Sequence, residues 1–230
     1  EALAVEASPR AAARLARSVS LNGLEASVRV LHAAGGAHAG VVRLLAKPKS
    51  SNSFTLAGAK SSRLSSSSSF AKQQRHGIGR EEEEEEDELD EEVEGELVEV
   101  PVVALDEVAP FPCTDLFISH TNGQELNVLR GARRLLARSR RSGAVVVLQL
   151  YGPQAGVLRD TGYDPGLAVR WLAVRGYQVA LARPPWRRLR VPGAVGRYFG
   201  EPGADHVVNV VAKSQRSHAM WRGSGKRLEG

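Results

Sequence analysis

The stretch LFISHTNGQELNVLRGARRLL, residues 116–136, changes character twice within a few positions. It opens as an apolar run, passes through a polar segment at 119–123, and then takes on helical spacing. We therefore predict a buried strand over 115–119 and an amphipathic helix over 124–138. One side of this helix is apolar and the other is basic, with Leu126, Leu129, Ala132, Leu135 and Leu136 on the first and Arg130, Arg133, Arg134 and Arg138 on the second. Because ligands of open α/β sheets bind at the carboxyl ends of strands, residues 119–123 are the first candidate site.

Strands and helices also alternate on both sides of this stretch. Residues 2–7 indicate a strand, and Ser8 and Pro9 are typical of the start of a helix that would end near Leu21. Further strands are expected at 27–34, 41–46, 98–108, 115–119, 144–152 and 206–212, and a helix followed by a strand at 165–181. Pro101 favours an edge position for the strand that contains it. The pattern predicts an α/β fold with a mostly parallel sheet, in which 144–152 is central.

Residues 47–96 interrupt the pattern. They are rich in serine and lysine and then strongly acidic, so they bury too little apolar surface to offset the entropy of ordering them. We expect a low-complexity, disordered insertion without tertiary contacts. It divides the α/β domain into an N-terminal part, 1–46, and a remainder, 97–212, followed by a basic tail, 213–230.

The net charge of +5 hides a separation of charge. Residues 81–96 hold 13 of the 26 acidic residues and no basic one, which leaves 31 lysines and arginines against 13 acids elsewhere. The acidic run is typical of a solvated tract that offsets a basic surface. A second interpretation is that the basic surface binds an acidic partner and that the tract competes for it. A nucleic acid is not favoured, because the sequence has no zinc-knuckle spacing and no aromatic-rich basic stretch.

The remaining composition bounds the environment. The single cysteine, Cys113, cannot form an internal disulfide, which favours a reducing compartment such as the cytoplasm. No apolar run reaches the roughly 20 residues that span a bilayer. The six histidines lack metal-ligand spacing, so no metal site is expected. The sequence begins at Glu1 without an initiator methionine, and we interpret it as a fragment.

Residues 115–136 resemble the signature segment of the FkbM-type methyltransferases. That signature has a strand ending Lys-x-Asp, then a Glu-Gly pair, a second Glu, and Leu-x-Val-Leu-x-Gly-Ala. The matching residues are Gly123, Glu125, Leu126, Val128, Leu129, Gly131 and Ala132. The stretches AVEASPRAAARLARSVSLNGL and VEVPVVALDEV resemble two further blocks of the family, in the same order. The resemblance implies a Rossmann-like fold, S-adenosylmethionine as cofactor, and transfer of a methyl group to a hydroxyl of an acceptor of the small-molecule, glycan or lipid type.

The resemblance also suggests site residues. Glu6, at the end of an early strand, would accept hydrogen bonds from the cofactor's ribose, although a carboxylate near a helix N-terminus is the alternative. His32, Ala33 and Ala34 would leave room for adenine. His120 and Asn122 would face the cofactor, and His120 is the candidate catalytic base, because its pKa lies near neutrality in the absence of perturbation.

The departures from the signature fall where the chemistry would occur. The family's Lys is Ile118, its Asp is His120, its first Glu is Asn122, and a later Glu is Gln149. His120 is then either a surviving base or a polar residue of a decayed pocket, and the alternative function is an inactive binding module with a basic surface. A dehydrogenase is less favoured, because no Gly-x-Gly-x-x-Gly follows a strand.

The family's first strand and the glycine-rich turn after it have no counterpart in this sequence. That strand would lie between the strand of Glu6 and the strand that ends before His120. We therefore expect either a gap between these two strands or their direct pairing, and weak binding of S-adenosylmethionine.

Overall fold

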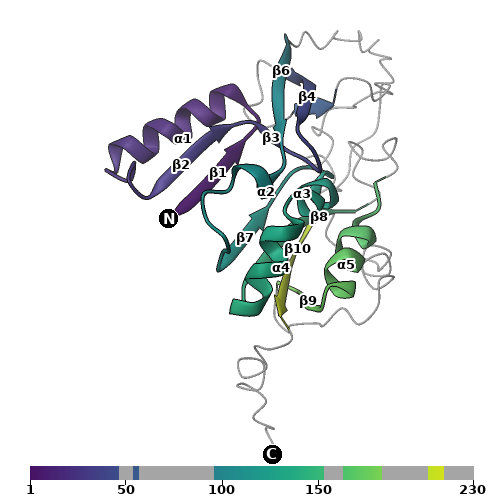
Figure 1. Ribbon diagram of the computed structural model, residues 1–230. Coiled ribbons are helices and arrows are strands. Elements are labelled where there is room, and N and C mark those ends of the chain that lie inside the picture. The colour runs from purple at the N-terminus through teal and green to yellow at the C-terminus, as the bar shows by residue number, and fades with distance from the viewer. Residues whose placement is uncertain (47–53, 57–95, 153–162, 183–206, 215–230) are drawn as a thin grey trace, which may run out of the picture.

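The computed structural model describes residues 1–46, 54–56, 96–152, 163–182 and 207–214. These residues form a mixed α/β structure with three small sheets, whose strand orders are β1-β2, β7-β8-β10-β9 and β3-β6-β4-β5 (Figure 1). Three strand pairings are parallel and four are antiparallel, so the expectation of a mostly parallel sheet is wrong. The physical reason is that β4 and β10 each run against both of their neighbours.

The first unit is a parallel strand pair joined by a helix. β1 (Ala2–Glu6) pairs with β2 (Val28–His32), and α1 (Pro9–Leu21) connects them. Ser8 caps α1 by accepting a hydrogen bond from the Ala11 amide at 3.2 Å, and Gly23, with φ +63°, follows its end. The predicted helix start and stop are therefore confirmed.

The second sheet corrects two expectations. β6 (Glu96–Val103) lies between β3 (Ala34–Gly35) and β4 (Gly40–Ala46), so Pro101 is not on an edge strand. The proline is tolerated because the two-residue β3 pairs only with Val102 and Val103, which leaves Pro101 without a partner on that side. β5 (Phe54–Leu56) pairs with β4, and Glu96 of β6 pairs with Ala46, so the expected lack of tertiary contacts over 47–96 fails for these four residues. The rest of the proposed insertion before Glu96 lies outside the described residues.

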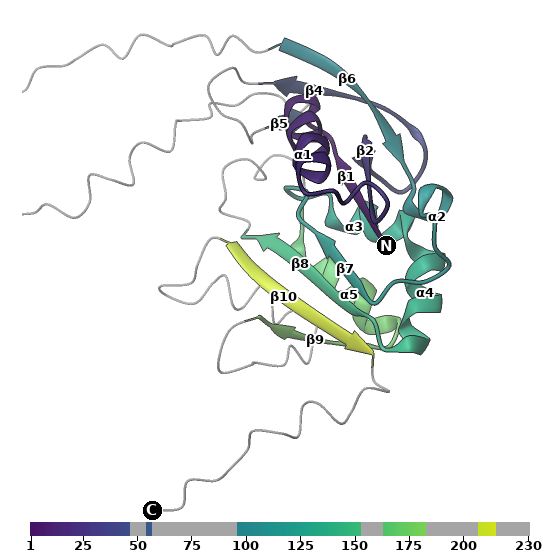
Figure 2. The same ribbon diagram turned by 90° about the vertical axis from the view of Figure 1, so that its left-hand side faces the viewer.

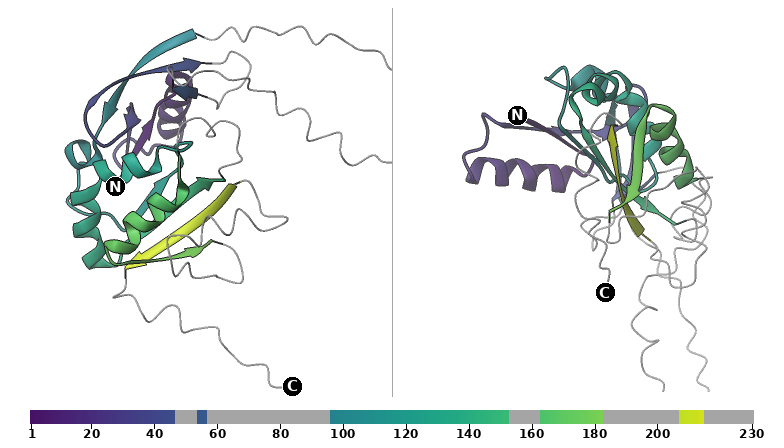
Figure 3. Two further views of the ribbon diagram at one scale, coloured as in Figure 1. Left: turned by 90° about the vertical axis from the view of Figure 1, so that its right-hand side faces the viewer. Right: turned by 90° about the horizontal axis from the view of Figure 1, so that it is seen from below.

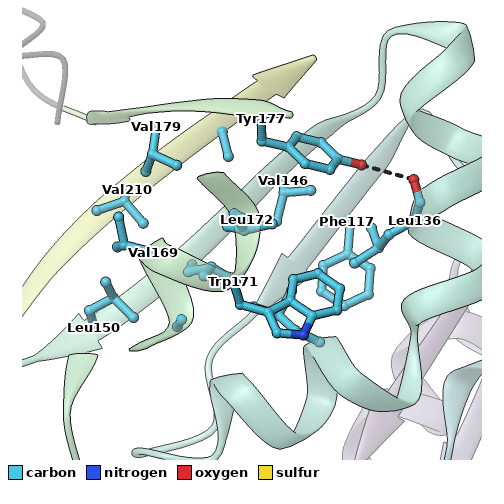
Figure 4. Packing of buried hydrophobic residues seen from close by; sticks show 14 of the residues in the cluster. Phe117, Leu136, Val146, Leu150, Val169, Trp171, Leu172, Tyr177, Val179 and Val210 are labelled. Atoms are coloured by element: carbon cyan, nitrogen blue, oxygen red, sulfur yellow. Dashed lines mark hydrogen bonds between the residues drawn. The ribbon is translucent and has the colours of Figure 1, made fainter. Parts of the chain in front are cut away.

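The third sheet carries the main core. β8 (Val145–Tyr151) lies between β7 (Leu116–Ser119) and β10 (Val207–Ser214), and β9 (Tyr177–Leu181) forms the far edge, so the predicted central position of β8 is confirmed. The helices α3 (Glu125–Gly131), α4 (Arg133–Ser142) and α5 (Pro165–Val174) lie together over one face (Figures 2 and 3). Figure 4 shows Leu172 and Trp171 of α5 packed toward Val146 and Phe117 of the sheet. At about 25 cal/mol per Å² of buried apolar surface, such packing is the main stabilising contribution to this sheet.

The opposite face of the same sheet is open near β7. Leu116 and Ile118 are 54% and 66% exposed, whereas Phe117 and Ser119, which point to the helical side, are buried. Side chains alternate between the faces along a strand, so the apolar composition of β7 places hydrophobic residues on both faces.

The helix predicted over 124–138 is divided at Ala132. The α2 helix (Leu105–Val108) explains the break, because its Asp106 carboxylate accepts hydrogen bonds from the Arg134 and Leu135 amides at 2.8 and 2.7 Å. These are amides of the first turn of α4, which have no partner within the helix. Asp106 therefore caps α4 from a neighbouring element, and residues 105–108 are helical where the sequence predicted an extended strand.

β1 and β7 do not pair with one another. Among the described residues β1 has only β2 as a partner and β7 has only β8, and the two strands point in the same general direction in Figures 1 and 2. Direct pairing of β1 and β7, one of the two expected outcomes, is thus not observed among the described residues, and the two strands are left unpaired with one another.

Candidate functional site

The turn after β7 is organised around one buried carboxylate. Glu125 is fully buried, and its Oε1 accepts hydrogen bonds from the Thr121 and Gly123 amides at 3.0 and 3.3 Å and from the Thr121 hydroxyl at 3.2 Å. Asn122 and Gly123 both have positive φ, +50° and +95°, which turns these amides toward the carboxylate. Glu125 therefore fixes the shape of the turn that carries His120 and Asn122. The sequence matched Glu125 to a family signature but did not indicate this role.

His120 is paired with an aromatic side chain from the neighbouring strand. Its Nε2 lies 2.9 Å from the hydroxyl of Tyr151, and the two rings are stacked, with centroids 6.1 Å apart and an interplanar angle of 26°. His120 is exposed, while Tyr151, at the end of β8, is half-buried. Sequence reasoning missed Tyr151; its position at the carboxyl end of a central strand was the available signal.

Three buried polar atoms near this turn make no hydrogen bond of standard geometry within the described part of the chain: Ser119 Oγ, Glu125 Oε2 and Tyr163 Oη. The Tyr163 hydroxyl nevertheless lies close enough to Glu125 and to the Tyr151 backbone for both to act on its pKa. Burial, and then the negative charge of Glu125, hold the pKa of Tyr163 well above its ordinary value. The same two causes, in the same order, raise the pKa of Tyr151. Both phenols are thus electrostatically coupled to Glu125. Buried polar atoms without partners are expected where a water or ligand completes the site.

Three of the four departures from the family signature share one face of the sheet. Ile118 pairs with Val147 in register, and the alternation along each strand places His120 with Ile118 and places Gln149 and Tyr151 with Val147. The Gln149 amide donates to Asn209 Oδ1 of β10 at 3.4 Å. This is the open face, away from the helices. Asn122 lies apart in the turn, half-buried.

Glu6 lies at the end of β1 and is half-buried. Its Oε1 accepts a hydrogen bond from the Ser8 amide at 2.7 Å, at the start of α1. This contact agrees with the helix-start alternative, and it leaves Oε2 for a second donor. His32 is opposite Glu6 in register, and its Nε2 lies 3.2 Å from the Ala7 carbonyl oxygen.

Of the two alanines expected to border adenine, Ala33 lies between β2 and β3, and Ala34 is the first residue of β3. Ala33 is buried and donates its amide to the Glu6 carbonyl oxygen at 3.0 Å, while Ala34 is half-buried and pairs with Val102. The following residues, Gly35 and Gly36, pack on α3: a methyl group added at Gly131 would overlap the Gly36 carbonyl oxygen. Gly131 is therefore a point of close backbone packing between α3 and the segment that follows β3.

The site residues therefore form two groups. Glu6, His32, Ala33 and Ala34 surround the ends of β1 and β2, while His120, Asn122, Glu125 and Tyr151 surround the ends of β7 and β8. No hydrogen bond joins the two groups within the described residues, and α3 is the element that both contact: it begins at Glu125 and packs on Gly36 at Gly131.

The described residues contain no group of three or more histidine, cysteine, aspartate or glutamate side chains that could hold a metal ion. Cys113 is exposed and is not part of a disulfide. None of the helices in the described ranges has the length and apolar character needed to cross a membrane. No protein-family model, curated protein sequence or solved structure matches this chain.

Proposed function

We propose that this chain is part of an FkbM-like, S-adenosylmethionine-dependent methyltransferase that acts on a hydroxyl group. The observation that carries the proposal is the His120–Tyr151 pair, which a turn braced by buried Glu125 holds at the carboxyl ends of two parallel strands. Ligands of open α/β sheets bind at such strand ends. The unpaired arrangement of β1 and β7 supports the same proposal, because the family's first strand would lie between them.

His120 has the properties of a general base. Its exposed imidazole can accept a proton from a hydroxyl, and the contact with Tyr151 holds one ring nitrogen in a fixed direction. When bound, S-adenosylmethionine supplies a methyl group on a positively charged sulfur. The role of His120 is then to take the acceptor's proton as its oxygen becomes nucleophilic.

The described residues fit only part of the cofactor. Glu6 keeps one carboxylate oxygen for the ribose hydroxyls, and Asn122 offers an amide to the same end of the sheet. Ala33 is too buried to present its side chain to adenine in this arrangement, so Ala34 is the better candidate. The described residues have no counterpart of the family's first strand with its glycine-rich turn, and the glycines at the end of β3, Gly35 and Gly36, pack on α3 instead. We therefore expect weak affinity for S-adenosylmethionine.

Calorimetric titration of this chain with S-adenosylmethionine tests the proposal, together with a form that carries an additional strand and glycine-rich turn ahead of Glu1. We expect weak binding to the first and at least tenfold tighter binding to the second, with Glu6→Gln reducing both. Absence of binding to either form at millimolar ligand contradicts the proposal.

The transfer step has a separate test. In an assay for methyl transfer to hydroxyl-bearing acceptors, His120→Ala is expected to lower turnover by about 10²–10⁴-fold, the usual contribution of a general base. His38→Ala, also an exposed histidine, is the matched control. Equal turnover in both variants excludes His120 as the base.

A binding module without catalysis is the second candidate function. The exposed Ile118 on the open face favours it, because an apolar side chain stands where the family has a lysine. In this case the basic surface, not the end of β7, would bind an acidic partner. Cofactor binding without turnover in the wild-type chain, across all acceptors, would support this function.

A further inference from the structure

A groove between α4 and the end of α5 gathers three arginines. Its volume is ≈ 360 Å³, and it is lined by the three arginines, Arg133, Arg140 and Arg175, and otherwise by uncharged residues that include Leu136, Val174 and Tyr177. No carboxylate is among these lining residues. Three cations without a lining anion repel one another, and a bound anion would relieve that repulsion.

Two of the three guanidinium groups are held in place. Arg140 donates to the Arg175 carbonyl oxygen at 3.0 Å and packs over Gly176, where an added side chain would meet it. Arg175 donates to the Trp171 carbonyl oxygen at 3.2 Å, and its guanidinium lies 3.8 Å from the centre of the Trp171 ring. Fixed guanidinium groups lose less entropy when they bind an anion.

Arg133 is the accessible member of the set. It is exposed on α4, and no ion pair or hydrogen bond of its side chain is present within the described residues. Desolvation, and then the charge of Arg133, lower the pKa of Arg175, so the two cations act on one another across the groove.

The floor of the groove is rigid and partly apolar. Leu136 and Tyr177 belong to the packed core, and the Tyr177 hydroxyl donates to the Leu136 carbonyl oxygen at 3.0 Å (Figure 4). Val174, at the rim, is 72% exposed. An anion bound here would have charged donors on both sides and an apolar surface beneath it.

We propose that this groove binds a phosphoryl group, either free phosphate or a phosphate carried on a larger molecule. A phosphate offers more oxygen acceptors and more negative charge than a carboxylate, and arginine binds it through paired N–H donors. The groove lies on the helical side of the sheet, away from the face that carries His120, so the proposal is independent of methyl transfer.

The test uses three probes on the full chain: inorganic phosphate, a phosphoserine peptide, and the same peptide with glutamate in place of phosphoserine. Calorimetry at low ionic strength should give saturable binding of the first two. Tighter binding of the phosphopeptide than of inorganic phosphate identifies a phosphate carried on a larger molecule as the ligand. Equal affinity for these two probes identifies free phosphate. The proposal is overturned if the glutamate peptide binds as tightly as the phosphoserine peptide, or if inorganic phosphate shows no saturable binding.

Matched variants localise the binding. Arg133→Ala should weaken phosphate binding about tenfold or more, as expected for a hydrogen bond to a charged group. Arg141→Ala, an exposed arginine of α4 outside the groove, should leave it unchanged. Val174→Glu should abolish binding, whereas Ala173→Glu, with the same charge change one residue away, should not. Equal losses within either pair would show a general charge effect and overturn the proposal.

Discussion

The unit β1–α1–β2 and the sheet β7-β8-β10-β9 differ in how they are held together. Within the described residues, the buried hydrophobic cluster has 18 members, all from Phe117 to Ala212, so none comes from the first unit. In α1 only Ala12 and Val19 are buried, and Leu21 is 75% exposed. Glu6, which is proposed to bind the cofactor's ribose, therefore belongs to the thinly packed unit, while His120 and Tyr151 belong to the well-packed one.

Core truncation should reveal the largest difference. Leu148→Ala, at a fully buried position of β8, is expected to lower the free energy of unfolding by about 2–5 kcal/mol, because it removes packed methyl groups and leaves a cavity. Leu15→Ala, the same change in α1 at a 36% exposed position, should cost within about 0.5 kcal/mol. Urea denaturation followed by circular dichroism measures both. Similar costs for the two variants would show that Leu15 is packed as tightly as Leu148 and would contradict the difference between the two regions.

The second-largest effect is expected at Gly131, where α3 contacts the segment that follows β3. Gly131→Ala adds a methyl group that would overlap the Gly36 carbonyl oxygen, and such overpacking costs about 1–3 kcal/mol. Helix propensity alone predicts the opposite sign, a gain of about 1 kcal/mol. Gly40→Ala, where no atom lies within 4 Å of the added group, is the control. A more stable Gly131→Ala variant would mean that the turn moves away at little cost.

The Asp106 cap should have a smaller effect. Asp106→Ala removes the acceptor for the Arg134 and Leu135 amides, and the loss of a helix cap costs about 1 kcal/mol. Glu107→Ala, at an exposed position of the same short helix, should change stability little. Thermal denaturation of the two variants gives the comparison, and equal melting temperatures would rule out a stabilising cap.

The smallest expected effect is on alkaline titration. The phenols of Tyr151 and Tyr163 have raised pKa values, so the folded chain keeps these protons after the unfolded chain loses them near pH 10. Stability is therefore full below about pH 10 and falls as the pH rises toward the folded-state pKa values. Glu125→Gln removes the repelling charge, so ultraviolet absorbance should report tyrosine ionisation at lower pH. Glu107→Gln is the matched control, and identical titration curves would contradict the coupling.

Local signals in the sequence predicted much of the fold. Ser8, Pro9 and Asn22-Gly23 define α1 through capping and turn chemistry, and the apolar run of β8 indicates its central position. The break at Ala132 was not predictable, because its cause is the Asp106 carboxylate, which lies 28 residues before the Arg134 amide that it caps. The antiparallel direction of β4 and β10 also depends on long-range pairing that no local pattern carries.

The candidate site was predicted only in part, for the same reason. His120 and Asn122 follow an apolar strand, which local reasoning can recognise. Tyr151 contacts His120 across neighbouring strands, and Tyr163 interacts electrostatically with Glu125. The roles of both tyrosines therefore depend on tertiary contacts. The small side chain of Ala33 favours a position beside adenine. Its burial results from the turn into β3, which a local pattern does not reveal.

Within the described residues one edge of β7 has no strand partner, which affects how the protein is expected to behave in solution. This strand has Leu116, Phe117, Ile118 and Ser119, with no charge and no proline to discourage pairing with another chain. Unprotected apolar edges act as templates for edge-to-edge association, which increases with protein concentration. We therefore expect colloidal stability to be limited by β7, and Ile118→Lys, at an exposed position, to improve solubility without disturbing the buried face.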